Sequence, residues 1–264
     1  MLMVISPAKS LDYETRIPSK KWSLPTLLED SEQLISVMRE KSPAQLQQLM
    51  GISESLAELN HERYLDWTLP FNVHNARPAV FAFAGDVYQG LDAYSLGERD
   101  FTHAQKTLRI LSGLYGALRP LDLIQPYRLE MGTKLRTERG RNLVDFWGPT
   151  ITNELNLAIE NSPGNRVLVN LASQEYFASV DPRRLNVPIV SPVFLDMDRS
   201  GTPRVISFFA KRARGLMARW MIRERVTRLR DLTDFHEAGY RYAGEQSSSD
   251  RPVFVRSSAA IPLR

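Results

Sequence analysis

Apolar residues recur at intervals of three and four positions in several stretches of the chain, and this periodicity predicts amphipathic helices. In the first stretch, Leu34, Ile35 and Met38 fall on one helical face. The same pattern predicts helices over residues 24–38, 43–49, 54–64, 101–111, 142–161 and 210–225. A kink is expected in the fifth of them at Gly148-Pro149, because proline lacks the N–H that a helix interior needs.

Shorter, continuous apolar runs predict buried strands over residues 2–6, 79–84, 166–171, 189–195, 205–209 and 252–256. The turn residues 198–201 predict that the fourth and fifth of these strands form a hairpin, and residues 113–132 are expected to be mostly loop. Strands and helices mix without strict alternation, and no internal repeat or linker divides the chain. We therefore expect one α/β domain over residues 1–264, with a mixed sheet surrounded by helices.

The amino-acid composition is that of a globular protein. The 264 residues are 43% hydrophobic and 24% charged, which suits a globular chain with a sizeable core. The chain has no cysteine, so disulfides, thiolate zinc sites, cysteine-ligated iron–sulfur clusters and thiol redox sensors are excluded. Pro7, Lys9 and Asp12 end the apolar start too early for a signal peptide, and no apolar run reaches about 18 residues. A cytoplasmic protein without a membrane partner is expected.

Positive charge is concentrated in two segments, although the net charge of the chain is only +4. Residues 103–141 carry a net charge of +5 and residues 204–230 carry +8, which leaves −9 for the rest of the chain. Such asymmetry favours a surface that faces a polyanion such as nucleic acid, or a phosphorylated ligand. The alternative is that basic helices are simply solvated and paired with acidic neighbours.

Polar residues follow several predicted strands. They are Ser6, Lys9, Asp86, Ser173, Glu175 and Lys211. Ligands of open α/β sheets bind outside the carboxyl ends of strands, so these residues predict a cleft that binds a phosphorylated or otherwise anionic ligand. The alternative is that the strands end in polar residues because they reach the surface there.

Standard catalytic and metal-binding patterns are absent from the sequence. It contains no P-loop, no dinucleotide-binding glycine pattern and no nucleophile elbow, and its four histidines show no metal-ligand spacing. We expect neither a cofactor nor a metal, and no catalytic residue is assigned. An enzymatic function is therefore less favoured than a binding function.

Residues 46–57 follow the template of a helix-hairpin-helix motif, which predicts such a motif within residues 43–64. In that motif a glycine allows close approach to a phosphate, and the next helix offers its N-terminal N–H groups. Gly51, Ile52 and Ser53 are the predicted DNA contacts. Ser53 replaces the second glycine of the template, and it suits a helix N-cap equally well. The alternative is an ordinary helical hairpin.

Arginines supply further candidate phosphate contacts. Arg212, Arg219 and Arg223 fall within about 40° of one another on a helical wheel, which predicts an arginine ridge. The segment with net charge +5 adds Arg109, Arg119, Arg128 and Arg136. Guanidinium groups bind phosphate oxygens bidentately, whereas the alternative is a solvated face paired with carboxylates.

Several longer motifs resemble the YaaA family over nearly the whole chain. They are Ile5-Ser-Pro-Ala-Lys9, Gly85-Asp86-Val-Tyr88, Leu111-Ser-Gly-Leu-Tyr-Gly116, Leu118-Arg-Pro-Leu-Asp122, Gln125-Pro-Tyr-Arg-Leu-Glu-Met131, Phe146-Trp-Gly148, Asn170-Leu-Ala-Ser173, Glu175-Tyr176-Phe177 and Lys211-x-Ala-Arg-Gly-Leu-Met217. Members of this family are described as bacterial peroxide-stress proteins that limit intracellular iron. They are also described as DNA-binding, with a helix-hairpin-helix motif and a positively charged cleft.

The resemblance implies DNA binding by the hairpin at residues 51–53. It also implies a cleft lined by residues such as Lys9, Arg109, Arg119, Arg128 and Lys211. Together with the predicted helix over residues 210–225, this points Arg214 into the cleft as a further candidate DNA contact. Backbone contacts to double-stranded or branched DNA would give little sequence specificity. No catalytic mechanism is implied.

Two other functions stay open from the sequence. One is an enzyme acting on a phosphate- or carboxylate-bearing small molecule in the basic cleft. The other, direct storage of iron, is disfavoured because the sequence has no Glu-x-x-His pair. Oligomeric state is not determined by any of these patterns.

Overall fold

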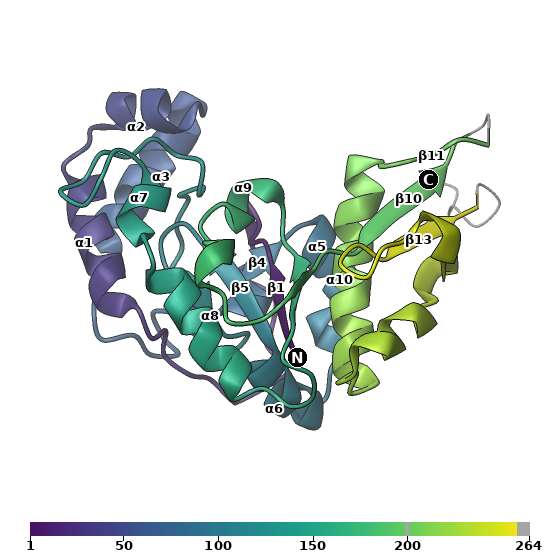
Figure 1. Ribbon diagram of the computed structural model, residues 1–264. Helices are drawn as coiled ribbons and strands as arrows, with labels where there is room; N and C mark the ends of the chain where they lie inside the picture. Colours follow the sequence, from purple (N-terminus) through teal and green to yellow (C-terminus); the bar gives the residue numbers. More distant parts are fainter. Residues whose placement is uncertain (199–200, 258–264) are drawn as a thin grey trace.

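A central, mainly parallel sheet is surrounded by helices (Figure 1). The computed structural model describes residues 1–198 and 201–257. Its α-helices are α1 (Leu28–Arg39), α2 (Pro43–Met50), α3 (Glu54–Asp66), α4 (Ala79–Ala82), α5 (Asp86–Leu91), α6 (Glu98–Thr107), α7 (Leu143–Trp147), α8 (Thr150–Glu160), α9 (Gln174–Phe177) and α10 (Ser207–Arg223). Short 3-10 segments lie at Ala93–Ser95, Pro182–Arg184, Leu229–Asp234, Glu237–Gly239 and Gly244–Gln246.

The central sheet has the spatial order β6-β5-β1-β8-β9. The strands of the structure are β1 (Leu2–Ile5), β2 (Ser10–Leu11), β3 (Arg77–Pro78), β4 (Phe83–Ala84), β5 (Leu108–Ser112), β6 (Gly116–Leu118), β7 (Leu123–Ile124), β8 (Leu168–Leu171), β9 (Ile189–Val190), β10 (Val193–Met197), β11 (Pro203–Arg204), β12 (Tyr240–Tyr242) and β13 (Val253–Arg256). β5, β1, β8 and β9 run parallel, and β6 is antiparallel to β5. Every residue of β1 is buried, as expected for a parallel strand covered on both faces.

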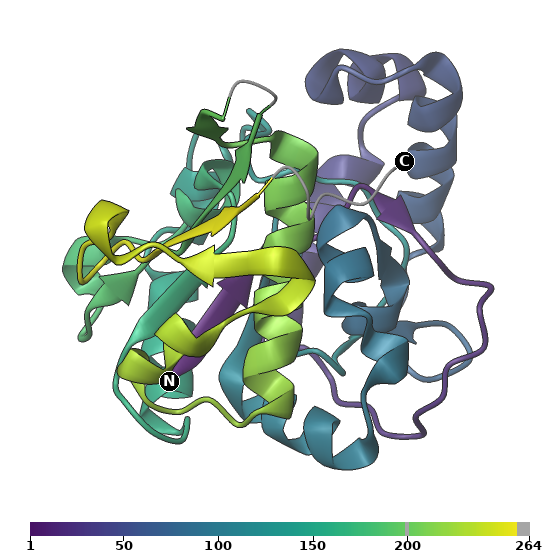
Figure 2. The same cartoon turned by 90° about the vertical axis from the view of Figure 1, so that its right-hand side faces the viewer.

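A second sheet, of order β11-β10-β13-β12, is joined to the first by helix α10. α10 packs against β10 on one side and against β1 and β8 on another, and it lies beside β1 in both views (Figures 1 and 2). Its Trp220 meets Phe235 in an edge contact at 5.5 Å between ring centroids. α10 is therefore the element that fixes the two sheets relative to each other.

Several predicted elements are confirmed with small shifts of their ends. The helices predicted over 24–38, 43–49, 54–64 and 210–225 correspond to α1, α2, α3 and α10. The predicted interruption at Gly148-Pro149 separates α7 from α8, and Gly148 has a positive φ of 46°. The mixed α/β class is also as expected.

Other predicted elements were wrong. Residues 79–84 form helix α4 before the two-residue strand β4, and the helix predicted over 101–111 ends at Thr107, where strand β5 follows. Residues 207–209 of the strand predicted over 205–209 form the start of α10, and β10 pairs instead with β11. The two central residues of the predicted turn, 199–200, lie outside the described residues. Short apolar runs suit a buried strand and a buried helix equally, so periodicity does not separate them.

Candidate functional site

The ends of β1 and β8 bring two serine side chains into contact at one edge of the central sheet. Ser6 follows β1 directly, and Ser173 follows β8, whose register pairs Ile5 with Leu171. The Ser173 amide donates a hydrogen bond to Ser6 Oγ at 2.8 Å, and the Ser6 hydroxyl donates to Ser173 Oγ at 3.3 Å. The two serines that the sequence placed at strand ends therefore touch.

Helix α5 lies against the same edge. The Tyr88 hydroxyl donates to the Ser6 carbonyl at 3.2 Å, and burial raises the pKa of Tyr88 well above its ordinary value, so the phenol keeps its proton. Gly85 packs against Ala8, which places the start of α5 beside the segment that follows β1. Asp86 opens α5 there, and among the described residues its carboxylate has no hydrogen-bond or ion-pair partner.

Glu130 joins two of the predicted basic residues into one cluster. Its carboxylate pairs with Lys9 Nζ at 2.9 Å and with Arg128 Nη2 at 3.1 Å. Lys9 is 63% exposed at its side chain, whereas Arg128 is 17% exposed. One carboxylate thus offsets part of both positive charges, and Arg128 is held inside the protein by this pair.

Glu175 extends the cluster from the end of β8. Its Oε1 accepts a hydrogen bond from the Gly132 amide at 3.1 Å, so the loop after Glu130 is tied to the start of α9. Tyr176 follows on α9. Burial raises the pKa of Tyr176 far above its ordinary value, and the neighbouring Tyr127, Glu175 and Glu130 add to this effect. The hydroxyl group therefore stays protonated beside two carboxylates.

Lys211 and Arg214 come from the N-terminal half of α10. Lys211 is exposed and has no ion-pair partner among the described residues. Arg214 is half-buried, and it too lacks any hydrogen-bond or ion-pair partner within residues 1–198 and 201–257. Burial lowers the pKa of Arg214, and no carboxylate counteracts that effect.

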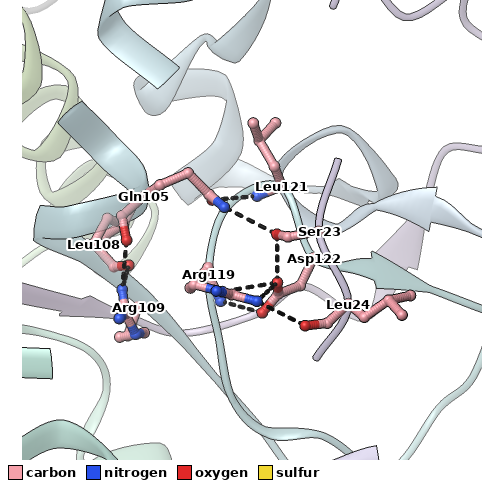
Figure 3. A network of polar contacts seen from close by, with 8 residues as sticks. All are labelled: Ser23, Leu24, Gln105, Leu108, Arg109, Arg119, Leu121 and Asp122. Atoms are coloured by element: carbon pink, nitrogen blue, oxygen red, sulfur yellow. Dashed lines mark hydrogen bonds and ion pairs between the residues drawn. The ribbon is translucent and has the colours of Figure 1, made fainter. Parts of the chain in front are cut away.

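The guanidinium groups of Arg109 and Arg119 donate hydrogen bonds to acceptors of the protein itself (Figure 3). Arg109 lies on β5, is 7% exposed, and donates to the carbonyls of Gln105 and Leu108, both at 2.9 Å. Burial lowers its pKa to about 10. Arg119 donates to Asp122 Oδ1 at 3.0 Å and to the Leu24 carbonyl at 2.7 Å. Both guanidinium groups therefore already have acceptors within the protein, and their role as DNA contacts stays a prediction.

The predicted arginine ridge on α10 is interrupted by ion pairs. Arg219 pairs with Asp92 at 3.1 Å and with Glu237 at 3.4 Å, and its side chain is 17% exposed. Arg212 and Arg223 are exposed, and neither has an ion-pair partner among the described residues. The alternative of an arginine paired with carboxylates therefore holds for Arg219, and the other two positions remain open to solvent.

A helical hairpin occupies the predicted position. A capping box at Ser42 begins α2, which ends at Gly51 with φ 62° and ψ 45°, in the left-handed region that glycine favours. Ser53 caps α3 by accepting a hydrogen bond from the Leu56 amide at 3.3 Å. Gly51 and Ser53 are exposed, whereas Ile52 is buried at 8%. The N-cap role that the sequence left open for Ser53 is therefore present.

A groove of about 560 Å³ lies along α2 beside this hairpin. Its lining consists of Lys41, Gln45, Gln48, Leu49, Gly132, Thr133 and Lys134. Gly132 also bonds to Glu175, so the groove adjoins the cluster at the ends of β1 and β8. Two lysines make the groove basic.

Within residues 1–198 and 201–257, no three acidic or histidine side chains come together as a metal site would require. No helix in these ranges is both long and apolar enough to cross a membrane.

Comparison with known proteins gives the family. Residues 1–246 match the family model described as peroxide stress protein YaaA. The chain belongs to this family. A UPF0246 protein of Shewanella loihica is 51% identical over 260 residues, which are 98% of this chain and 100% of the relative. A UPF0246 protein of Hahella chejuensis is 50% identical over 256 residues, which are 97% of this chain and 99% of the relative.

Family membership confirms the resemblance drawn from the motifs, and the family's name supports a role in peroxide stress. The structure adds Tyr88, Glu130 and Tyr176 to the residues predicted at the sheet edge. All three lie inside the quoted motifs, but none directly follows a strand, so the strand-end pattern missed them. Polar residues within long motifs are the signal that would have found them.

Proposed function

We propose that this protein binds DNA through phosphate contacts at the α2–α3 hairpin, largely without sequence preference, and that it limits iron-dependent DNA damage during peroxide stress. The family's name supports the link to peroxide stress. The observation that carries the DNA contact is the exposed turn at Gly51, which leads directly into the first turn of α3. In that turn the Glu54 and Ser55 amides have no intrahelical acceptor, and an N-terminal turn of this kind favours a phosphate oxygen.

The positive charge for this contact comes from the groove beside α2. Glu54 opens α3 and is exposed, so the first turn of that helix has no positive side chain of its own. Lys41 and Lys134 line the groove and have no carboxylate partner among the described residues. A phosphate backbone passing the hairpin would therefore meet two lysines within the same surface.

α10 supplies charge on the other side of the sheet edge. Figure 1 shows α2 and α10 on opposite sides of α9, which follows β8. A polyanion held at the hairpin would be attracted from a distance by Arg212 of α10. Arg212 is exposed and lacks an ion-pair partner in the described part of the chain. Charges at such a rim act mainly by long-range attraction.

The test of the proposal is a Gly51→Asn variant, measured by fluorescence anisotropy with duplex, single-stranded and branched DNA. Asparagine tolerates a positive φ, so the hairpin is expected to keep its fold, whereas the added side chain hinders close approach of a phosphate. Affinity is expected to fall about tenfold, or about 1.4 kcal/mol. Wild-type affinity should itself fall by at least tenfold between about 50 and 200 mM salt, because bound phosphates release counterions.

The matched control is Gly201→Asn. Gly201 also has a positive φ, of 79°, and no atom of the described residues lies within 4 Å of the place a Cβ would take, but it lies in the β10–β11 connection. This variant should bind DNA like the wild type. Equal affinities of the Gly51→Asn variant and the wild type would refute the hairpin contact.

Arg212 and Arg219 give a second prediction. Arg212→Ala is expected to lower the slope of log affinity against log salt by about 1, because one free cation is removed. Arg219→Ala should leave this slope unchanged, because Asp92 and Glu237 already neutralise that guanidinium. Its effect on the free energy of unfolding should stay below about 1 kcal/mol, as for partly exposed pairs. The check is a salt titration of DNA affinity for both variants; a slope lowered only by Arg219→Ala would reverse the assignment.

A further inference from the structure

The edge between β1 and β8 is the point where the central sheet changes its direction of winding. From β1 the chain first adds β5 on one side, and it later adds β8 and then β9 on the other side. The connections therefore leave the ends of β1 and β8 in opposite directions. In open parallel sheets, small ligands bind outside the carboxyl ends of the strands at this reversal, because the diverging loops leave room there.

Ser173 carries a hydrogen-bond donor that has no acceptor at this edge. Its Oγ receives the hydrogen bond of Ser6, and its own amide donates to Ser6 Oγ. Ser173 is also the N-cap of α9, yet its side chain accepts no capping hydrogen bond. Among the described residues nothing accepts the Ser173 hydroxyl proton, so that proton is free to be donated to a ligand oxygen.

Arg214 is the candidate source of positive charge for this edge. On α10 it occupies the same stripe as Ala210, Met217 and Ala218, each at most 5% exposed, so the side chain leaves the helix on a buried face. The next residue, Gly215, lies against the backbone of α5, and Tyr88 of α5 bonds to Ser6. α10 also packs on β1 and β8.

An unpaired, half-buried guanidinium is costly unless an anion reaches it. Arg219 on the same helix has two carboxylate partners, whereas Arg214 has none within residues 1–198 and 201–257. The free-energy cost of moving a charge out of water is offset when the charge forms a charge-assisted hydrogen bond. The two-pronged guanidinium of arginine fits a phosphate or carboxylate group best. The residue type and its lack of a partner therefore both favour an anionic ligand.

We propose that the edge between β1 and β8 binds a small organic anion, whose phosphate or carboxylate group is held by Ser6, Ser173 and Arg214. This site is separate from the hairpin and goes beyond the proposed DNA contact. Glu130 and Glu175 border it and would accept hydrogen bonds from donor groups elsewhere on the ligand. No carboxylate or imidazole in the described ranges bonds to either serine, so the arrangement supports binding rather than nucleophilic catalysis.

The test is isothermal titration of the full chain with inorganic phosphate and, separately, with malonate, at constant ionic strength. We expect the wild type to bind at least one of the two with a Kd below about 10 mM, and the better probe identifies the group that the ligand carries. Arg214→Met should weaken this binding at least about tenfold, and Ser173→Ala should weaken it about threefold. Methionine suits the stripe because Met217 already packs there.

Arg223→Met is the matched control, because it removes one exposed arginine from the far end of the same helix. It should change anion affinity by less than about twofold. Gly51→Asn should bind the anion like the wild type, and Arg214→Met should bind DNA like the wild type. Circular dichroism checks folding, and Ser173→Ala carries the test if Arg214→Met does not fold.

Three results would overturn the proposal. The first is that neither anion binds the wild type. The second is an equal loss of anion binding in Arg223→Met and Arg214→Met. The third is a parallel loss of DNA and anion binding in Arg214→Met, which would make this edge part of the DNA surface.

Discussion

Gly215→Ala is expected to destabilise the protein by about 3 kcal/mol or more, a large part of the stability of a typical domain. A Cβ at this position would lie 1.8 Å from the Val87 carbonyl oxygen and 2.7 Å from the Leu91 amide nitrogen, both backbone atoms of α5. Gly90 on α5 faces α10 in the same way, at 2.1 Å from the Arg212 carbonyl oxygen. The two helices can separate only if α10 also leaves the sheets that it joins. Chemical denaturation of both proteins measures the loss.

Whether Gly215→Ala lowers or raises the free energy of unfolding tests the close approach of α5 and α10. In an open helix interior, Gly→Ala stabilises by up to about 1 kcal/mol, because alanine is the better helix former. A gain of that size would show that α5 and α10 do not approach as described. Gly244→Ala is the control, since its Cβ would lie 3.5 Å from Tyr242 Cε1, an ordinary contact, and a change below about 1 kcal/mol is expected.

Arg119→Met is expected to lower the free energy of unfolding by about 2 kcal/mol while leaving DNA affinity unchanged. Asp122 is 1% exposed, and Arg119 supplies its charged partner at 2.9 Å. Burial already raises the pKa of Asp122 above its ordinary value, so loss of the guanidinium leaves a buried carboxylate without its charged partner. The expected loss of about 2 kcal/mol is at the low end for buried ion pairs, because the Arg119 side chain is 31% exposed. Denaturation and DNA anisotropy on the same preparation check both parts.

The Asp122→Asn substitution tests the cause of that loss. Asparagine keeps an acceptor for the hydroxyl of Ser23, which donates to Asp122 Oδ1 at 2.6 Å, but it carries no charge. Arg119→Met should therefore cost less in the Asp122→Asn background than in the wild type. Equal costs in both backgrounds would show that the ion pair is not the source. A fall in DNA affinity of the folded Arg119→Met variant would show that Arg119 contributes to the DNA surface.

The local sequence determined the elements whose signals are local. The α2–α3 hairpin follows from Ser42-Pro43, Gly51 and Ser53, because capping and a left-handed turn depend on neighbouring residues alone. α10 follows from its long apolar stripe. The segment 189–195 shows the limit: it reads as one strand, but it divides into β9 in one sheet and β10 in the other. That division depends on which strands each half pairs with, and these lie far away in the chain.

For the candidate site, the strand-end pattern identified Ser6 and Ser173, because parallel neighbouring strands must present their carboxyl ends at one edge. It did not identify Glu130, whose position depends on its pairs with Lys9 and Arg128. From the sequence, Arg109, Arg119 and Arg214 were all equivalent candidates for contacts with an anion. Tertiary structure separated them, because the carbonyls around Arg109 and the carboxylate beside Arg119 come from packing, while Arg214 received no partner among the described residues. The sequence by itself thus determined the family, the hairpin and the excess of basic residues. Only the packing of distant segments decided which of those charges are neutralised and which are left for a ligand.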